Sequence, residues 1–323
     1  MIKKERKPPL ELFQLEAALR RIPVIYAKRE VLESKYRRRK AGYTGELQLD
    51  YELSFLRNHE FFILNDLRLP HQGKHFQMDS LLLSTFFFLK LEAKHLSGKI
   101  LIDHHLNQMT RTLNSREEGY SCPVQQVKRH ELQLKEWLAI TKNAPVPMQS
   151  LVVFTNPNSI LTVSSGHPGK NIIIKNQILT EKIANLQKIY QTPNYTKKDL
   201  SKISRQLIKQ HSPRSENILN KFKIPPQDML TGVFCPRCNH LPMVRLHGKW
   251  QCTKMACGHI SKDAHLSALR DYALIFGSSI TNAQCRKFLH IPSRSVTQKL
   301  LASMELPSIG TTRSHVYQLP LEE

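Results

Sequence analysis

The sequence predicts an α/β protein in which a mixed sheet is flanked by helices, followed by a small cysteine-rich module and a C-terminal helical domain. Three observations support this fold class. Apolar runs typical of buried strands alternate with amphipathic helical segments in residues 41–176. Four cysteines are concentrated in residues 232–261. Three short helical patterns follow in residues 262–323.

The residues before the sheet predict a basic, helical N-terminal extension, residues 1–40. Apolar residues recur at helical spacing over 10–22, and Pro23 interrupts the pattern. A solvated helix face or arm is one interpretation of the basic run that comes next, and contact with nucleic-acid phosphates is the other. The run includes Arg37, Arg38, Arg39 and Lys40.

An amphipathic helix is predicted over 42–58, because leucines such as Leu49 and Leu53 recur at helical spacing. Glu46 extends this buried stripe, since it lies three residues before Leu49. A carboxylate on the buried side of a helix can reach a metal ion bound by the strands that follow. Complementing the dipole of the helix in its first turn is the alternative role.

Two consecutive apolar runs, 76–84 and 86–94, predict a pair of buried strands joined by a short turn. Asp79 lies in the first strand. Glu92 and Lys94 share one face of the second, because side chains alternate with period two. Ionisable groups in such apolar sequence are costly to bury unless they serve each other or a metal.

Two carboxylates and a lysine in this pattern are what a magnesium-dependent phosphodiesterase requires. The carboxylates hold a hard cation through oxygen, and the lysine orients water or stabilises developing phosphate charge. The alternative is a solvated Glu-x-Lys pair on an edge strand. A helix over 122–138, opened by Pro123, adds Gln126, which either faces a phosphate or lies on the surface. Strands are further predicted at 98–103, 151–156 and 171–176, and a surface loop over 104–121.

The combined motifs resemble the NERD (nuclease-related) domain, a family assigned to the PD-(D/E)xK phosphodiesterase superfamily. The resemblance covers roughly residues 40–155. It departs from the family at Cys122-Pro123, where an Asn-Pro pair is usual. The segments that carry it are Gly45-Glu46, Gln77-Met78-Asp79, Glu92-Ala93-Lys94 and Pro123-Val124-Gln125-Gln126.

This resemblance implies a PD-(D/E)xK-like nuclease core that uses Mg²⁺ or Mn²⁺. It implies that Glu46, Asp79 and Glu92 bind the metal and that Lys94 is the catalytic lysine. It also implies that Gln126 is a site residue on the following helix. Related nuclease folds include inactive members, so the resemblance by itself leaves turnover open.

Residues 177–231 predict a helical segment, with a helix over 200–211, and then a linker with a domain joint near 212–230. The cysteines that follow have the spacing C-x2-C-x13-C-x4-C, which predicts a zinc ribbon with a closed, structural Zn²⁺ site. His259 is a possible substitute ligand, and a disulfide pair is the alternative. The predicted ligands are Cys235, Cys238, Cys252 and Cys257.

The last domain, 262–323, predicts helices over 262–276, 280–291 and 293–304 and a short strand at 315–320. Two short helices across a tight turn suggest a helix-turn-helix-like module, although small helical bundles share this pattern. Val296, Leu300 and Met304 are the predicted core stripe of the third helix. Its exposed face offers residues suited to phosphates and base edges, namely Arg294, Gln298 and Lys299.

The chain of 323 residues has a formal net charge of +22, which indicates a polyanionic partner. Basic residues outnumber acidic ones by 13 to 5 in 1–40, 12 to 4 in 151–231 and 11 to 5 in 232–323. The numbers are equal, 12 and 12, in 41–150. Ribosome-associated, membrane-surface and heparin-binding proteins share such an excess. Neither a signal peptide nor a membrane-spanning run is evident, which predicts a cytoplasmic protein.

The leading hypothesis is a metal-dependent nuclease acting on DNA, without a membrane or a small-molecule cofactor. A DNA-binding regulator with a degenerate nuclease fold is the main alternative. An RNA-processing factor would explain the charge but not the acidic motif. The sequence leaves DNA versus RNA, endo- versus exonuclease action and oligomeric state open.

Overall fold

The computed structural model describes residues 1–56, 60–310 and 315–321, and contacts divide the chain into two compact units. The first unit consists of Met1–Pro8 and Arg38–Arg214, and the second of Pro9–Arg37 and Ser215–Glu323. The first 40 residues are therefore shared between the two units. Within the described ranges, no helix is both long enough and apolar enough to span a membrane.

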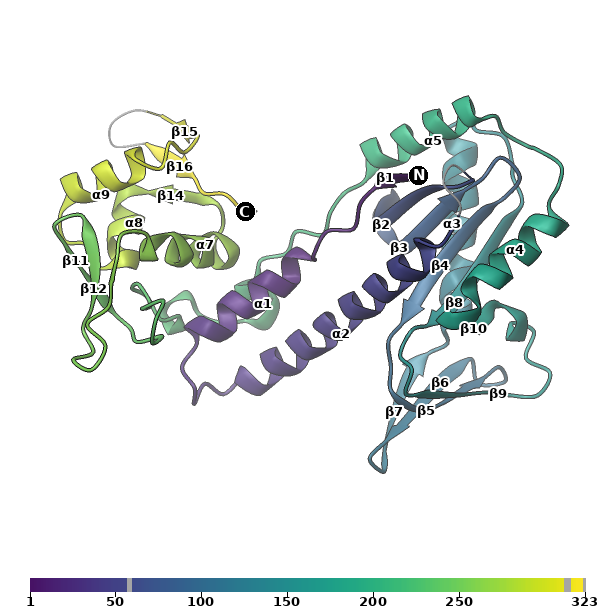
Figure 1. Ribbon diagram of the computed structural model, residues 1–323, viewed down its shortest axis with the longest axis horizontal. Helices are drawn as coiled ribbons and strands as arrows, with labels where there is room; N and C mark the ends of the chain where they lie inside the picture. Colours follow the sequence, from purple (N-terminus) through teal and green to yellow (C-terminus); the bar gives the residue numbers. More distant parts are fainter. Residues whose placement is uncertain (57–59, 311–314, 322–323) are drawn as a thin grey trace. The chain divides into compact units, whose positions relative to one another are not determined.

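The first unit is built on a six-stranded mixed sheet in the order β1-β2-β3-β4-β8-β10 (Figure 1). Strands β2, β3 and β4 form an antiparallel meander, and β1, β8 and β10 are parallel to their neighbours. The predicted mixed sheet is thus present. Its strands are β1 (Ile2–Lys4), β2 (Phe62–His71), β3 (Lys74–Leu83), β4 (Phe88–Lys94), β8 (Met148–Phe154) and β10 (Ile173–Lys175).

Helices cover both faces of this sheet. On one face, α2 (Arg29–Leu53) and α4 (Leu179–Ile189) share a core with Leu89 and Leu91 of β4. On the other face, α3 (Pro123–Ile140) and α5 (Lys197–Gln210) pack on β2 and β3. Helices on opposite faces can therefore supply side chains to the same strand end.

Helix α2 differs from the sequence prediction at both ends. The helix predicted over 42–58 begins at Arg29 and ends at Leu53, and positions 57 and 58 lie outside the described residues. The basic run from Arg37 to Lys40 is therefore helical. Leu49 and Leu53 are buried as predicted.

A second, four-stranded sheet in the order β7-β6-β5-β9 lies in the same unit. The loop predicted over 104–121 is wrong, because this segment contains β6 and β7. Most of their side chains are at least partly exposed, so no apolar alternation reveals them. The strands are β5 (Gly98–Asp103), β6 (Gln108–Leu113), β7 (Arg116–Ser121) and β9 (Ser159–Val163).

In the second unit, α1 (Leu10–Arg21), α6 (Ile218–Phe222) and α7 (Ala264–Phe276) share one apolar core. Arg21, which is fully buried, donates from Nε to the carboxylate of Asp271 at 2.8 Å. The segment predicted as a linker near 212–230 thus contains α6 and contributes to this core.

The remaining elements of the second unit surround another core that contains Trp250 and Phe288. The buried residues of the last helix, Arg294–Ala302, are Thr297, Leu300 and Leu301. Val296 is 39% exposed, so the prediction that it belongs to the buried stripe is wrong. The elements are β11 (Met243–Leu246), β12 (Lys249–Cys252), β13 (Ile260–Ser261), β14 (Ser279–Thr281), α8 (Asn282–Leu289), α9 (Arg294–Ala302), β15 (Ser308–Ile309) and β16 (Val316–Gln318).

Candidate functional site

The candidate site lies where β3 and β4 separate. Their last ladder pair is Ser80 with Leu91, so Asp79 and Glu92 follow directly beyond the paired region. Asp79 Oδ2 accepts a hydrogen bond of 2.8 Å from the Ala93 N–H, in place of a ladder bond. The separation of the strands leaves room for two carboxylates at one strand end.

Within β3, the side chains that point into the core change from even-numbered to odd-numbered positions at this point. Phe76 and Met78 share a core with Leu81 and Leu83, although strict alternation would place these pairs on opposite faces. The change falls between Met78 and Leu81, at Asp79. A local irregularity of this kind re-aims a side chain, as β-bulges next to active sites do.

Glu92 is the most enclosed acidic group of the site, with 4% of its surface exposed. Its Oε1 accepts from Lys94 Nζ at 2.9 Å and from Gln126 Nε2 at 2.6 Å. Gln126 Oε1 in turn accepts from Lys94 Nζ at 3.1 Å. Burial alone would raise the pKa of Glu92, but the ammonium groups of Lys94 and Lys90 outweigh it and lower the pKa.

Asp79 has the opposite electrostatic character. Burial, followed by the negative charges of Glu92 and Glu46, raises the pKa of Asp79 to about 8. A carboxylate held at so high a pKa favours a bound proton or cation. The structure therefore brings Asp79, Glu92, Lys94 and Gln126 together at one strand end.

Glu46 reaches this region from α2, with its carboxylate already paired. Arg6 Nη1 donates to Glu46 Oε2 at 3.0 Å, and Arg39 Nη1 donates to Oε1 at 3.2 Å. Arg6 also bonds the carboxylate of Asp50 and the backbone oxygen of Asp79. Glu46 is thus the neighbour of Asp79 but is held by two guanidinium groups.

Three site residues were not predicted from the sequence. Lys90 and His130 are buried beside Glu92, and Arg6 joins Glu46 to β3. The spacing of two of them could have indicated their place in the site. Lys90 is two residues before Glu92 in a strand and His130 is four residues after Gln126 in a helix, so each shares a face with a predicted site residue. No local pattern reveals Arg6, which is 73 residues from its Asp79 partner.

The charge of Lys90 affects the protonation of His130. Burial, then the charge of Lys90, lowers the pKa of His130 to about 4. Burial also lowers the pKa of Lys90, whereas the carboxylates of Glu92 and Asp79 act in the opposite direction. His130 is therefore neutral at physiological pH.

The donor set of Asp79 and Glu92 fits a hard divalent cation. Mg²⁺ is usually held by one or two carboxylates together with waters and substrate phosphates. Oε2 of Glu92 is buried and makes no hydrogen bond among the described residues, and its one ion-pair partner, Lys90 Nζ, is 3.4 Å away, so it is the less firmly engaged oxygen of this carboxylate. Glu46 fits less well, because both of its oxygens are engaged.

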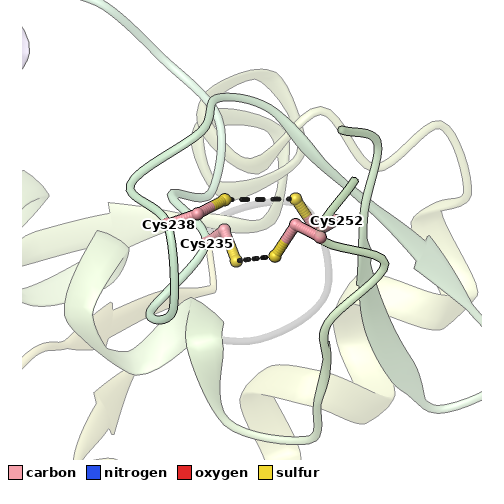
Figure 2. Close-up of side chains that lie close together, drawn as sticks. Cys235, Cys238 and Cys252 are labelled. Atoms are coloured by element: carbon pink, nitrogen blue, oxygen red, sulfur yellow. Dashed lines mark hydrogen bonds between the residues drawn. The ribbon is translucent and has the colours of Figure 1, made fainter. Parts of the chain in front are cut away.

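The four predicted zinc ligands do converge in the second unit. Their sulfur atoms all lie within 4.8 Å of one another, with Cys235 to Cys257 at 3.8 Å and Cys238 to Cys252 at 3.6 Å. A tetrahedron of zinc–sulfur bonds has edges of about 3.8 Å. Figure 2 shows Cys235, Cys238 and Cys252 with their sulfurs turned inward. The cluster therefore fits a zinc site, and it does not include His259.

The basic residues predicted to bind nucleic acid are on helices. Arg37, Arg38 and Lys40 are exposed on α2, whereas Arg39 is partly buried against Glu46. Helix α9 exposes three further predicted residues while Thr297 and Leu300 face the core. These residues are Arg294, Gln298 and Lys299.

The comparison with protein families identifies one match. Residues 41–155 match the nuclease-related domain, NERD. No curated protein and no solved structure matches the chain. The matched segment contains Glu46, Asp79, Glu92, Lys94 and Gln126, whereas Arg6 lies before it. The match indicates a nuclease-related function for this segment, which accords with a divalent metal and a nucleic-acid partner.

Proposed function

We propose that this protein is a metal-dependent nuclease that hydrolyses phosphodiester bonds in DNA. One observation carries the proposal. In the nuclease-related segment, Lys94 and Gln126 donate hydrogen bonds to Glu92, and Asp79 accepts one from the adjacent Ala93 N–H, so the four residues gather where β3 and β4 separate. This combination of groups is suited to phosphoryl-transfer chemistry.

Asp79 and Glu92 would hold Mg²⁺ or Mn²⁺, with Glu46 as a third ligand if it exchanges an arginine partner. A bound divalent ion polarises a phosphoryl oxygen and lowers the pKa of bound water. The high pKa of Asp79 supports this assignment, because its carboxylate is poorly stabilised by the protein alone.

Lys94 would orient the attacking water or stabilise charge that develops on the phosphate. Its Nζ is held between Glu92 and Gln126, so its position is defined before substrate binds. Gln126 would fix the geometry of both neighbours, since it contacts each of them. Preorganised donors of this kind need no rearrangement during the reaction.

The regions on either side of the nuclease-related segment would bind the DNA. The zinc ribbon would be structural, because four thiolates leave no open position on the metal. Helices α8 and α9, with the sheet β14-β16-β15, would form a helix-turn-helix-like module with a wing. Its contacts would come from Arg294, Gln298 and Lys299, with further phosphate contacts from the basic run on α2.

Cleavage of supercoiled plasmid tests the proposal. Wild-type protein should nick the plasmid with Mg²⁺, and Asp79→Asn or Glu92→Gln should reduce the rate at least about a hundredfold with little loss of DNA affinity. Glu117→Gln, a change at an exposed carboxylate on β7, is the matched control and should cleave normally. Equal nicking by Asp79→Asn, Glu92→Gln and wild type would contradict the assignment.

A DNA-binding regulator is the second candidate, and one observation favours it. Glu46 and Glu92 are each paired with two basic side chains, which compensate the charge of the carboxylates without a metal. A regulator should bind DNA selectively without Mg²⁺, and this binding should survive Asp79→Asn. A folded, zinc-loaded wild type that binds DNA but cleaves no substrate would support this alternative.

A further inference from the structure

Lys90 occupies an unusual place in the candidate site. It is 2% exposed, on a strand whose neighbouring residues Leu89 and Leu91 are fully apolar and buried. Its Nζ lies 3.4 Å from Glu92 Oε2, while Lys94 Nζ lies 2.9 Å from Oε1. Each oxygen of the Glu92 carboxylate therefore faces its own ammonium group.

The two ammonium groups contact Glu92 differently. Lys94 and Gln126 form regular hydrogen bonds to Oε1. Lys90 Nζ and Glu92 Oε2 are both buried, and neither makes a hydrogen bond among the described residues. Their separation also exceeds the usual length of about 2.7–2.9 Å for a charge-assisted bond. Lys90 is thus a loosely held counter-charge at the oxygen that is otherwise available to a metal.

Structural stability does not account for a lysine at this position. A buried ion pair is often no better for stability than apolar residues of similar volume. Glu92 already has Lys94 and Gln126 as partners, so it does not depend on Lys90 for pairing. A long apolar side chain would fill the same space without the desolvation cost.

We propose that Lys90 is a built-in counter-cation that faces Oε2 of Glu92 and weakens divalent-metal binding until a substrate phosphate arrives. The inference rests on the proposed function, in which Asp79 and Glu92 are metal ligands. A metal at Glu92 must displace the Lys90 ammonium or bind beside it against charge repulsion. A substrate phosphate adds ligands and negative charge, so metal and substrate bind together. Lys90 is in this sense a positioning residue and not a catalytic one.

Binding of Mn²⁺ to zinc-loaded, full-length protein tests the role of Lys90. Free Mn²⁺ is followed by electron paramagnetic resonance at fixed pH without DNA, and an Asp79→Asn/Glu92→Gln double variant defines binding elsewhere. Lys90→Met should bind Mn²⁺ about tenfold more tightly than wild type, because repulsion is removed and Oε2 is released. Lys90→Arg, which keeps the charge, should stay near the wild-type affinity.

Lys99→Met is the matched control, because Lys99 is exposed on β5 in the same unit and should not affect Mn²⁺ binding. Thermal unfolding provides a second readout, since Mn²⁺ should raise the melting temperature of Lys90→Met more than that of wild type. If the methionine variant does not fold, Lys90→Gln takes its place with the same expectation. Unchanged or weaker Mn²⁺ affinity in the folded variant would overturn the role of Lys90.

The same data separate this inference from the proposed function. If wild type binds Mn²⁺ at the carboxylates and Lys90→Met binds it equally, only the role of Lys90 fails. If neither protein shows binding beyond the double variant, the metal-dependent function fails with it. Binding by Lys90→Met alone would support the inference most directly.

Discussion

At the residue scale, Gly45 shows how the absence of a side chain positions a helix beside the candidate site. A Cβ atom added to Gly45 would lie 2.5 Å from His95 Cβ and 2.9 Å from Thr155 Oγ1. Both neighbours follow strand ends at the site, and the Thr155 N–H donates to the Lys94 oxygen. The close approach of α2 to these strand ends is what brings Glu46 near Asp79.

Gly45→Ala is therefore expected to destabilise the protein by about 1–3 kcal/mol, because the added methyl overpacks a closed contact. Gly42→Ala is the matched control in the same helix, where a Cβ would meet only Arg39 Nη1 at an ordinary 3.5 Å. That change should stabilise by up to about 1 kcal/mol through helix propensity. Denaturant unfolding of both variants measures the difference, and equal effects would contradict the packing argument.

The same scale shows why Asp79 and Glu92 behave differently although they are neighbours. Glu92 has two ammonium groups at its oxygens, so its pKa falls despite burial. Burial, followed by two acidic neighbours, raises the pKa of Asp79 to about 8, and its one backbone N–H partner offsets this only in part. A pair of carboxylates with opposed pKa shifts is typical of a functional site.

At the element scale, the three-stranded sheet β11-β12-β13 beside the four-cysteine cluster is connected to the helical core through Trp250. This residue is fully buried, and its indole N–H donates to His265 Nδ1 on α7 at 3.2 Å. Arg245 on the paired strand β11 lies over its ring. Trp250 therefore packs inside the unit, in the same core as Cys235 and Cys252, and we expect its fluorescence to depend on the integrity of the cysteine site.

Removal of zinc should shift the fluorescence of Trp250 to longer wavelength, because structural zinc holds small domains folded. A Trp137→Phe background isolates the signal, since the chain has two tryptophans. Cys252→Ser should bind zinc more weakly and show the shifted emission without chelator. Cys285→Ala, at a buried cysteine outside the cluster, should retain one zinc per chain. Unaltered zinc content in Cys252→Ser would refute a four-cysteine site.

Helix α9 illustrates how packing selects between faces that a sequence leaves ambiguous. Thr297, Leu300 and Leu301 face the core, so Val296 is left partly exposed. The rotation keeps Arg294, Gln298 and Lys299 on the outside. The residues predicted to be exposed on this helix are thus exposed, although one residue of the predicted buried stripe is exposed as well.

At the scale of the whole molecule, the charge excess is concentrated outside the matched nuclease-related segment. Acidic and basic residues balance in 41–150, and all other regions are strongly basic. Binding to DNA should therefore fall steeply with salt, because each neutralised phosphate releases counterions. This distribution favours binding through the flanks and chemistry in the centre.

Substitutions on α9 test whether the flanking regions bind DNA while the central segment carries out the chemistry. Arg294→Gln and Lys299→Gln should each weaken DNA binding and reduce the slope of log affinity against log salt by about 1. The Mn²⁺ affinity of the carboxylate site should not change. Lys99→Gln, at an exposed lysine on β5 in the charge-balanced segment, is the control and should leave the slope unaltered. Fluorescence anisotropy across a salt series makes the measurement, and identical slopes for all variants would exclude α9 as a contact.

The features that could be predicted from the sequence alone are those that depend on local periodicity and spacing. Strands β3 and β4, helix α3 and the four zinc-site cysteines were all predicted, because apolar alternation and cysteine spacing are short-range patterns. The same patterns placed Asp79, Glu92, Lys94 and Gln126 on adjoining elements, and the match over 41–155 covers these residues. Exposed strands such as β6 and β7 were missed, since they bury too little to alternate.

Contacts between groups that are distant in the sequence follow from the packing of the folded chain. Arg6 reaches Glu46 and the backbone of Asp79 across 40 and 73 residues, and the first 40 residues divide between two units. Lys90 is buried beside Glu92, so its ammonium group contacts this carboxylate and is not solvated. The physical reason is that local periodicity records which face of an element is apolar, whereas pairing of buried charges depends on the elements that pack against that face.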